Sequence, residues 1–429
     1  MGRLAIRLAE PIDPRSIAAF RALFGGILFI AIVRFAANGW IDSQLAAPTY
    51  HFTYAGFRFV RPLPGVWLWV HFAVMAVAAL ALALGVRPRL AAAVFCLLFT
   101  WAELIEKAAY LNHYCFVSLM TALLAVVRTD GAFALWPAPG PAAVSRGALL
   151  LLRAQVALVY FYAGFAKIDA DWLLRAEPLA TWLPAHADWP LIGPLLAASA
   201  TAYAFSWLGM LFDLTIWAFL AWSRTRRVAF AVAVFFHLAV WALFPIGLFS
   251  PLMLAAATLF FAPGWPRWGR APASPRPRPS RALLALAGAW LAVQLFVPLR
   301  FLLYPGPVNW TEEGFRFAWR VMLVEKTGHI EYRLRSNGRP ERRVVPGARL
   351  TPLQARMLAI APDFIIEYAH HLAEEARDAG ETGVEVRADA FVAFNGRPAQ
   401  RLVDPEVDLA AQPMFTWAPA GWIRSPHGH

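Results

Sequence analysis

The stretch "GALLLLRAQVALVYFYAGFAK", residues 147–167, is almost continuously apolar and ends on a lysine. A helix of about 20 apolar residues can cross the roughly 30 Å hydrocarbon core of a bilayer. Two carboxylates, Asp169 and Asp171, follow the lysine closely. The stretch therefore predicts a membrane-spanning helix, and it raises the question of what an amine does at the end of that helix.

Apolar stretches of this length recur along the first three-quarters of the chain. Hydrophobic residues make up 59% of the 429 positions and charged residues 15%, with a mean hydropathy of +0.51. Such a composition is typical of a membrane protein and not of a soluble one. We predict a mainly α polytopic membrane protein with about nine transmembrane helices, near residues 16–36, 65–85, 88–107, 112–128, 147–167, 198–222, 226–243, 247–263 and 282–304.

The net charge of +12 would suggest a nucleic-acid partner in a soluble chain, but its distribution indicates topology instead, so no nucleic acid is expected. Basic residues gather in alternate loops, at Arg3, Arg7, Arg15, Arg87, Arg89, Arg128, Arg146, Arg224, Arg226, Arg227, Arg267, Arg270, Arg276, Arg278 and Arg281. The positive-inside rule then predicts a cytoplasmic N-terminus, and an odd number of spans places the C-terminal residues outside. No cleavable signal peptide is evident. The high Ala and Arg content favours a bacterial source, and in a bacterium the expected location is the inner membrane.

The last part of the chain differs in character. A Pro/Arg-rich segment, residues 264–281, predicts a solvated cytoplasmic loop inside a transmembrane domain that covers residues 1–304. Residues 305–429 predict an extracytoplasmic α+β domain. In it, Asn337-Gly338 and Asn395-Gly396 lie between alternating runs and predict hairpins with type I′ turns. A helix is expected to start at Pro362.

Ionisable residues inside spans are costly unless paired or hydrated, so each is a candidate site residue. The candidates are Arg21, Glu103, Glu106, His113, Arg153, Lys167, Asp213 and His237. For Arg21, Arg153 and Asp213 the alternative interpretation is structural: an internal ion pair, or a hydrogen-bonded strut that joins two helices. Glu106 and Lys107 lie near a short turn, where we expect them to reach the interface. Cys96 and Cys115 are expected to be free thiols.

Two of these candidates carry possible chemistry. A partly desolvated amine at Lys167 could act as a base, or it could be an ordinary interfacial lysine, and Asp169 and Asp171 would favour its charged form. His113 could contact an oxyanion or act as an interhelical strut. The chain shows no zinc motif, P-loop, dinucleotide fingerprint or nucleophile elbow, and no metal is expected.

Several stretches together resemble one family. "AAFRALFGGILF" at 18–29, "YLNHYCF" at 110–116, "VYFYAGFAKIDADW" at 159–172, "FFHLAVWALFPIGLFSPLML" at 235–254, "NWTEEGFRFAWRVML" at 309–323 and "RLVDPEVDL" at 401–409 are similar to successive landmarks of the vitamin K-dependent gamma-glutamyl carboxylase family. Bacterial relatives of that family carry the same horizontally transferred transmembrane domain. The order and separation agree along nearly the whole chain.

The resemblance implies an enzyme that oxygenates a vitamin K-type hydroquinone, or a related menaquinol, to its epoxide. This step is coupled to carboxylation of protein-bound glutamate, with O2 and CO2 consumed. It assigns the base to Lys167 and oxyanion support to His113 and Asn112. The lipid bilayer and a glutamate-containing protein on the outer face are the implied partners. Residues expected to bind the quinone or the peptide are Trp310, Phe315, Arg316, Trp319, His237, Arg21 and Arg153.

Two departures from the family pattern leave alternatives open. The animal enzymes carry a further C-terminal region that has no counterpart after about residue 415, and Phe315 and Phe317 stand where those proteins have tyrosines. An uncoupled quinone epoxidase is one alternative. A non-catalytic quinone- or lipid-binding membrane protein is another.

Overall fold

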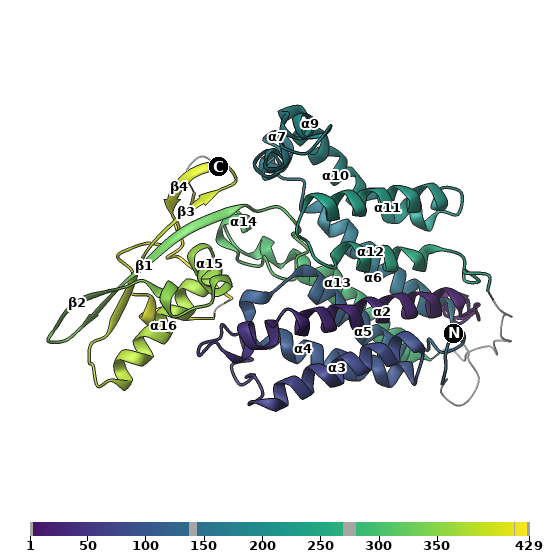
Figure 1. Ribbon diagram of the computed structural model, residues 1–429, viewed down its shortest axis with the longest axis horizontal. Coiled ribbons are helices and arrows are strands. Elements are labelled where there is room, and N and C mark those ends of the chain that lie inside the picture. Colours follow the sequence, from purple (N-terminus) through teal and green to yellow (C-terminus); the bar gives the residue numbers. More distant parts are fainter. Residues whose placement is uncertain (1–2, 137–143, 269–279, 416, 427–429) are drawn as a thin grey trace.

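The computed structural model describes residues 3–136, 144–268, 280–415 and 417–426, and it consists of a helical bundle with a smaller α+β domain at one end (Figure 1). Among these residues, seven helices are long and apolar enough to cross a membrane. They are α2 (Arg15–Ala37), α3 (Val66–Leu84), α4 (Pro88–Ile105), α6 (Arg146–Phe165), α10 (Ser199–Ala221), α11 (Arg226–Leu243) and α13 (Arg281–Phe296), which a 3-10 helix (Val297–Leu303) extends. The fold class predicted from the sequence is confirmed.

Two further apolar helices complete the nine predicted positions. They are α5 (Asn112–Val126) and α12 (Phe249–Ala257), the latter followed by a 3-10 turn (Thr258–Phe260). Both are shorter than the helices that are long enough to cross a membrane.

Apolar side chains cover the outside of the bundle as well as its interior. Val77, Leu97 and Phe235 are 66%, 73% and 75% exposed. A surface of this kind is suited to lipid and not to water. Small residues let some helices pack closely, as at Gly25, where an added Cβ would lie 2.5 Å from the backbone nitrogen of Ala83.

The basic segments that the structure describes lie together, at the end of the bundle away from the sheet, where Figure 1 places the N-terminus. Backbone hydrogen bonds join Ile12 to Val144, Ser16 to Pro263, and Arg87 to Trp136. We refer to this end as the basic end and to the other as the sheet end. Of the predicted loop at 264–281, residues 269–279 lie outside the described residues.

Short elements fill the connections between the long helices. They are α1 (Arg3–Leu8), a π-helical turn (Ile41–Ala46), 3-10 helices (Lys107–Ala109, Leu183–His186, Pro346–Ala348 and Leu409–Ala411), α7 (Ala170–Leu174), α8 (Leu179–Trp182), α9 (Gly193–Ala197) and α14 (Val308–Thr311). Cys96 and Cys115 are free thiols, as predicted.

The C-terminal domain is a four-stranded antiparallel sheet with two helices against it. The strands are β1 (Lys326–Ser336), β2 (Arg339–Val344), β3 (Glu385–Phe394) and β4 (Arg397–Arg401), in the order β2-β1-β3-β4. Both predicted hairpins form. At the second hairpin Asn395 and Gly396 both have positive φ, as a type I′ turn requires. At the first hairpin only Gly338 has positive φ, so the prediction of a type I′ turn there was wrong.

The two helices of this domain are α15 (Pro352–Ile360) and α16 (Pro362–Asp378), and the second starts where predicted. Alternate strand residues such as Tyr332 and Val386 are buried against α16, whose Phe364 and Ile365 are fully buried. The sheet and the helices therefore share one hydrophobic core.

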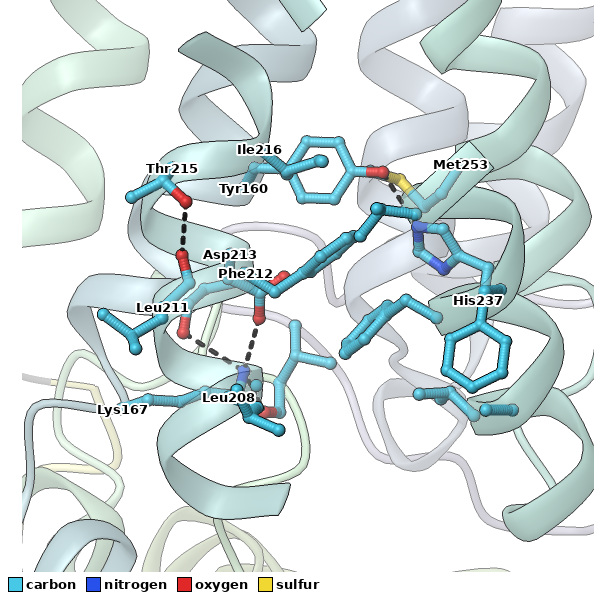
Figure 2. A pocket seen from close by; sticks show the side chains of 18 of the residues that line it. Tyr160, Lys167, Leu208, Leu211, Phe212, Asp213, Thr215, Ile216, His237 and Met253 are labelled. Carbon is cyan, nitrogen blue, oxygen red and sulfur yellow. Dashed lines mark hydrogen bonds and ion pairs between the residues drawn. The ribbon is translucent and has the colours of Figure 1, made fainter. Parts of the chain in front are cut away.

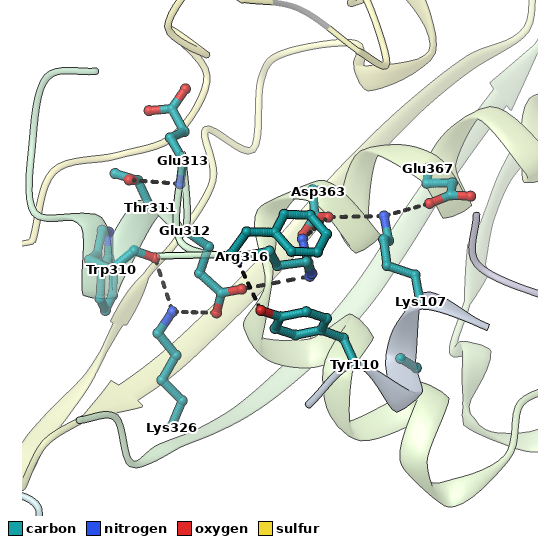
Figure 3. A network of polar contacts seen from close by, with 12 residues as sticks. Lys107, Tyr110, Trp310, Thr311, Glu312, Glu313, Arg316, Lys326, Asp363 and Glu367 are labelled. Carbon is teal, nitrogen blue, oxygen red and sulfur yellow. Dashed lines mark hydrogen bonds and ion pairs between the residues drawn. The ribbon is translucent and has the colours of Figure 1, made fainter. Parts of the chain in front are cut away.

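A chain of ion pairs attaches the C-terminal domain to the bundle (Figure 3). Lys107 and Glu367 are buried in it, whereas the side chain of Asp363 is 36% exposed. Lys107, in the loop before α5, lies 2.9 Å from Asp363 and 2.7 Å from Glu367 at the start of α16. Arg316 also pairs with Asp363, at 2.6 Å. The expectation that Glu106 and Lys107 reach the membrane interface was wrong, because each is only 3% exposed. Their charges hold the two parts of the protein together.

Candidate active site

Lys167 lies just past the end of α6, at the sheet end of the bundle. Its side chain is 6% exposed, and its Nζ donates to Oδ2 of Asp213 at 2.9 Å and to the carbonyl of Ala163 at 3.2 Å (Figure 2). The ammonium also lies 5.2 Å from the ring centroid of Trp172. Lys167 therefore points neither into lipid nor into bulk water. It is held inside the protein by a carboxylate and an aromatic ring.

The approach of α10 to α6 explains how Asp213 reaches the lysine. Gly164 lies one turn before Lys167, and a Cβ added there would lie 2.5 Å from the backbone nitrogen of Leu214. Only a glycine permits this contact between the two backbones. Because Gly164 has no side chain, α10 comes close enough to α6 to place Asp213 beside Lys167. The ion-pair reading of Asp213 was correct, while its partner could not be named from the sequence.

The two carboxylates of the "AKIDADW" motif have other partners. Asp169 accepts a hydrogen bond from the backbone of Asp171 and caps α7. Asp171 receives hydrogen bonds from Arg397 at 2.7 Å and from Asn395 at 3.1 Å. Burial alone would raise the pKa of Asp171, but these bonds more than offset it, so its pKa lies below the usual value. Asp171 thus attaches the motif to the C-terminal domain, and Asp213 supplies the carboxylate to Lys167.

Lys167 and Asp213 lie in the wall of a large apolar cavity, which we call the first cavity. Its volume is about 740 Å³, and most of its lining comes from apolar residues of α6, α10 and α11. It reaches from Trp172 near the sheet end to Arg224 in the turn at the basic end. A long apolar cavity with a polar group at one end is suited to a ligand with a polar head and an apolar tail.

A second polar pair lies in the same cavity. His237 of α11 and Tyr160 of α6 are both buried, and the Tyr160 hydroxyl is 2.8 Å from Nε2 of His237 (Figure 2). The other ring nitrogen of His237, Nδ1, is buried and has no hydrogen-bond partner among the described residues. A buried nitrogen in that state is available to a polar atom of a ligand. Tyr160 was not among the candidates, because a tyrosine in an aromatic-rich span gives no distinctive signal.

Asn112 and His113 line a different cavity, which we call the second cavity. Its volume is about 410 Å³. Asn112 donates to the carbonyl of Arg320 at 3.2 Å and accepts from the hydroxyl of Tyr110 at 3.1 Å. His113 packs against the ring of Phe249, with the centroids 5.9 Å apart. The two cavities share a wall of three residues, namely Phe249, Val321 and Met322.

The shared wall comes partly from a strained segment, residues 312–322. Glu312, Phe317, Trp319 and Met322 all have positive φ without being glycine. Such residues cluster at functional sites, because the surrounding structure must hold them in place. The carbonyl of Val321 lies 3.5 Å from Nζ of Lys167. The segment thus contacts the predicted site through its backbone, which the sequence pattern does not reveal.

The remaining predicted residues of "NWTEEGFRFAW" line neither cavity. Trp310 donates to the carbonyl of Arg424 and packs on Phe394, inside the C-terminal domain. Arg316 belongs to the ion-pair chain through its contact with Asp363. Trp319 is buried in the core of the bundle, and Phe315 is half-buried.

Two predicted arginines also lie outside both cavities. Arg153 donates to the carbonyls of Leu259 and Phe261, both at 2.8 Å, and so caps the end of the α12 segment. Arg21 is fully buried and donates to the carbonyl of Phe133. These contacts fit the strut reading of both residues. In the described part of the chain, no group of three or more potential metal ligands comes together.

Comparison with known protein families covers almost the whole chain. The family model described as the HTTM domain matches residues 9–265. The model described as the vitamin K-dependent gamma-carboxylase, lumenal domain, matches residues 279–428. No solved structure matches the chain.

Proposed function

Because the chain belongs to the gamma-glutamyl carboxylase family, we propose that it oxygenates a vitamin K-type hydroquinone or menaquinol and couples this to carboxylation of protein-bound glutamate. The observation that carries the proposal is the buried Lys167–Asp213 pair in the wall of an elongated apolar cavity. The apolar length suits an isoprenoid tail and the pair suits the hydroxyl groups of a quinol head.

In this proposal Lys167 removes the proton of a quinol hydroxyl. An ammonium cannot accept a proton, so the proton shared by the pair must first move to Asp213. The 2.9 Å contact between Nζ and Oδ2 permits that transfer. Both charges lose solvation in an apolar cavity. This loss raises the free energy of the ion pair and brings it closer to that of the neutral pair. The neutral amine of Lys167 is then the base.

Other side chains of the first cavity would hold the head group. The free Nδ1 of His237 faces a polar atom of the ligand, while Tyr160 fixes the orientation of the imidazole. When bound, the oxygenated quinol supplies the base that removes the γ-proton of glutamate. The balanced reaction converts quinol, O2, CO2 and glutamate to epoxide, water and γ-carboxyglutamate. The protein contributes positioning, proton transfer and exclusion of water.

The basic end of the bundle faces the cytoplasm in this proposal, and the C-terminal domain lies outside, in a bacterial inner membrane. Support comes from the arginine-rich segments that the backbone hydrogen bonds hold at one end. A protein substrate would therefore approach from the outer face.

The experiment combines the reconstituted protein with hydroquinone, O2, labelled bicarbonate and a glutamyl peptide. The proposal expects epoxide and peptide-bound label in comparable amounts. Epoxide without label would instead identify an uncoupled quinone epoxidase. Tight quinol binding with no oxygen consumption would identify a non-catalytic binding protein and contradict the proposal.

A further inference from the structure

The connection between α6 and α10 carries few charges for a segment that joins two membrane helices. We call residues 170–198 the connecting segment; it contains α7, α8, a 3-10 helix and α9. Between Glu177 and Asp213 the only Asp, Glu, Lys or Arg is Asp188. In Figure 1, α7 and α9 lie beside the long helices, at the top of the view. A segment surrounded by water usually exposes more charged side chains than this.

One side of the connecting segment belongs to the protein interior. Trp172, Leu179, Leu183 and Leu196 are buried in a hydrophobic cluster that also contains residues of α10 and α11. Trp172 and Leu179 line the first cavity as well. This side of the segment therefore has its partners within the protein.

The other side of the connecting segment is apolar too. Leu174, Leu191 and Leu195 are 70%, 99% and 61% exposed. Leaving such side chains in water forgoes about 25 cal/mol for each Å² of apolar surface. An element that is apolar on both its inner and its outer side is typical of a lipid environment.

The length of α10 indicates the depth of these leucines in a bilayer. Its 23 residues span about 34 Å, close to the roughly 30 Å of hydrocarbon. The basic turn that contains Arg224 marks one boundary, so the other boundary falls at the first turns of α10. There the hydroxyl of Tyr203 donates to the carbonyl of Leu174 at 2.9 Å. The hydroxyl of Thr201 donates to the carbonyl of Leu195 at 2.6 Å. Both leucines therefore lie at the level where acyl chains meet headgroups.

Two aromatic side chains satisfy backbone groups at the same level. Nε1 of Trp207 donates to the carbonyl of Leu173 at 3.2 Å, next to the bond from Tyr203 to the carbonyl of Leu174. These carbonyls end α7, and the last carbonyls of a helix have no partner within it. Such groups need protein donors where water is excluded. Exposed Tyr and Trp residues, with an apolar ring and a polar tip, are also typical of a membrane interface.

We propose that the connecting segment is a lipid anchor, which enters the leaflet at the sheet end without crossing it. Its partner is phospholipid, and Leu174, Leu191 and Leu195 lie among the upper parts of the acyl chains. Elements of this kind reach about 5–10 Å into the boundary between headgroups and acyl chains. The anchor does not depend on the reaction proposed above. It fixes Trp172 and Leu179, and with them the polar end of the first cavity, relative to the lipid surface.

Fluorescence quenching in phospholipid nanodiscs that hold one copy of the full-length protein tests the anchor. Leu191→Cys and Leu195→Cys are each labelled with a polarity-sensitive fluorophore, and the wild type, treated identically, gives the background from Cys96 and Cys115. One quencher is a phospholipid with a nitroxide near the headgroup end of its acyl chain, and the other is iodide in the water. Both labels are expected to lose at least about 2-fold more emission to the lipid quencher than to iodide, because a depth of about 5–10 Å keeps hydrated ions away.

Two other exposed apolar positions calibrate the assay. Val77→Cys, on the membrane helix α3, should be quenched by the lipid, and Val345→Cys, in the C-terminal domain, should be quenched by iodide. Stronger quenching by iodide than by lipid at Leu191→Cys and Leu195→Cys would overturn the proposal. Protection of both labels from both quenchers would also overturn it, because protein and not lipid would then cover the leucines.

Discussion

Replacing Gly164 by alanine is expected to force α6 and α10 apart at the point where the Lys167–Asp213 pair forms. The new Cβ would lie 2.5 Å from the backbone nitrogen of Leu214, whereas ordinary contacts start at 3.4 Å. The backbones must therefore separate by about 1 Å. The 2.9 Å contact of the pair would then exceed the range of a hydrogen bond.

Both stability and activity should respond to this change. Overpacking of this kind costs about 1–3 kcal/mol. A displacement of about 1 Å in a catalytic group can lower the rate by about 100-fold. We expect Gly164→Ala to lower the apparent Tm in detergent and to reduce epoxide formation by at least about 10-fold.

The assay measures epoxide chromatographically from quinol and O2, with no peptide present, alongside thermal unfolding. Gly26→Ala is the matched control, because Gly26 lies in α2 with no atom within 4 Å of an added Cβ. It should keep full activity and the wild-type Tm or a slightly higher one. Wild-type activity and Tm in Gly164→Ala would refute the reasoning.

Three further predictions concern charged groups. Asp213→Asn leaves a buried cation without its carboxylate, so the free energy of unfolding should fall by about 3 kcal/mol; an unchanged unfolding midpoint would contradict this. The pKa of Asp171 is lower in the folded protein than in the unfolded chain, where it is about 3.9. The pair with Arg397 therefore stabilises the folded protein fully at pH values above the unfolded pKa. This stabilisation is lost as the pH falls through the lower folded pKa. Asp171→Asn should therefore lower the Tm near neutral pH and make the Tm depend less on pH below a pH of about 4. Parallel curves of Tm against pH for the wild type and the variant would count against this prediction. Lys107→Met should destabilise the protein by about 3–5 kcal/mol, whereas Arg349→Gln, in an exposed pair, should change stability by less than about 1 kcal/mol; similar unfolding shifts for both variants would argue against the buried network.

The membrane fold follows closely from the sequence because apolar length is a local property. Each of the nine predicted segments contains a helix, and with the 3-10 extensions of α12 and α13 counted, the ends lie within about three residues of expectation. The short α5 and α12 were less predictable, since hydropathy does not report where a helix ends inside a bundle. The second hairpin also follows from its local Asn395-Gly396 signal.

The site was less predictable because its partners come from distant segments. Lys167 and Asp213 are 46 positions apart, and Lys107 and Glu367 are 260 apart. Nearby sequence suggested Asp169 and Asp171 as the carboxylates around the lysine, but both turn toward α7 and the C-terminal domain. Pairing of this kind depends on helix packing, which a single sequence does not encode locally.

Division of the site into two cavities could not be seen in the sequence either. Lys167 lines the first cavity and His113 the second, while the shared wall uses Phe249 and the strained Met322. Backbone strain has no simple residue signature when the residue is not glycine. Lys167 and His113, which the resemblance assigns to the same reaction, thus line two adjoining cavities.

The most direct test of the central proposal compares wild type with Lys167→Met for quinol binding and epoxide formation in the same preparation. Methionine keeps an unbranched apolar chain in the cavity and removes the amine. We predict similar quinol affinity with epoxide formation about 10²- to 10⁴-fold slower, the usual contribution of a general base. Epoxide formed by Lys167→Met at the wild-type rate would contradict the assignment of Lys167 as the base.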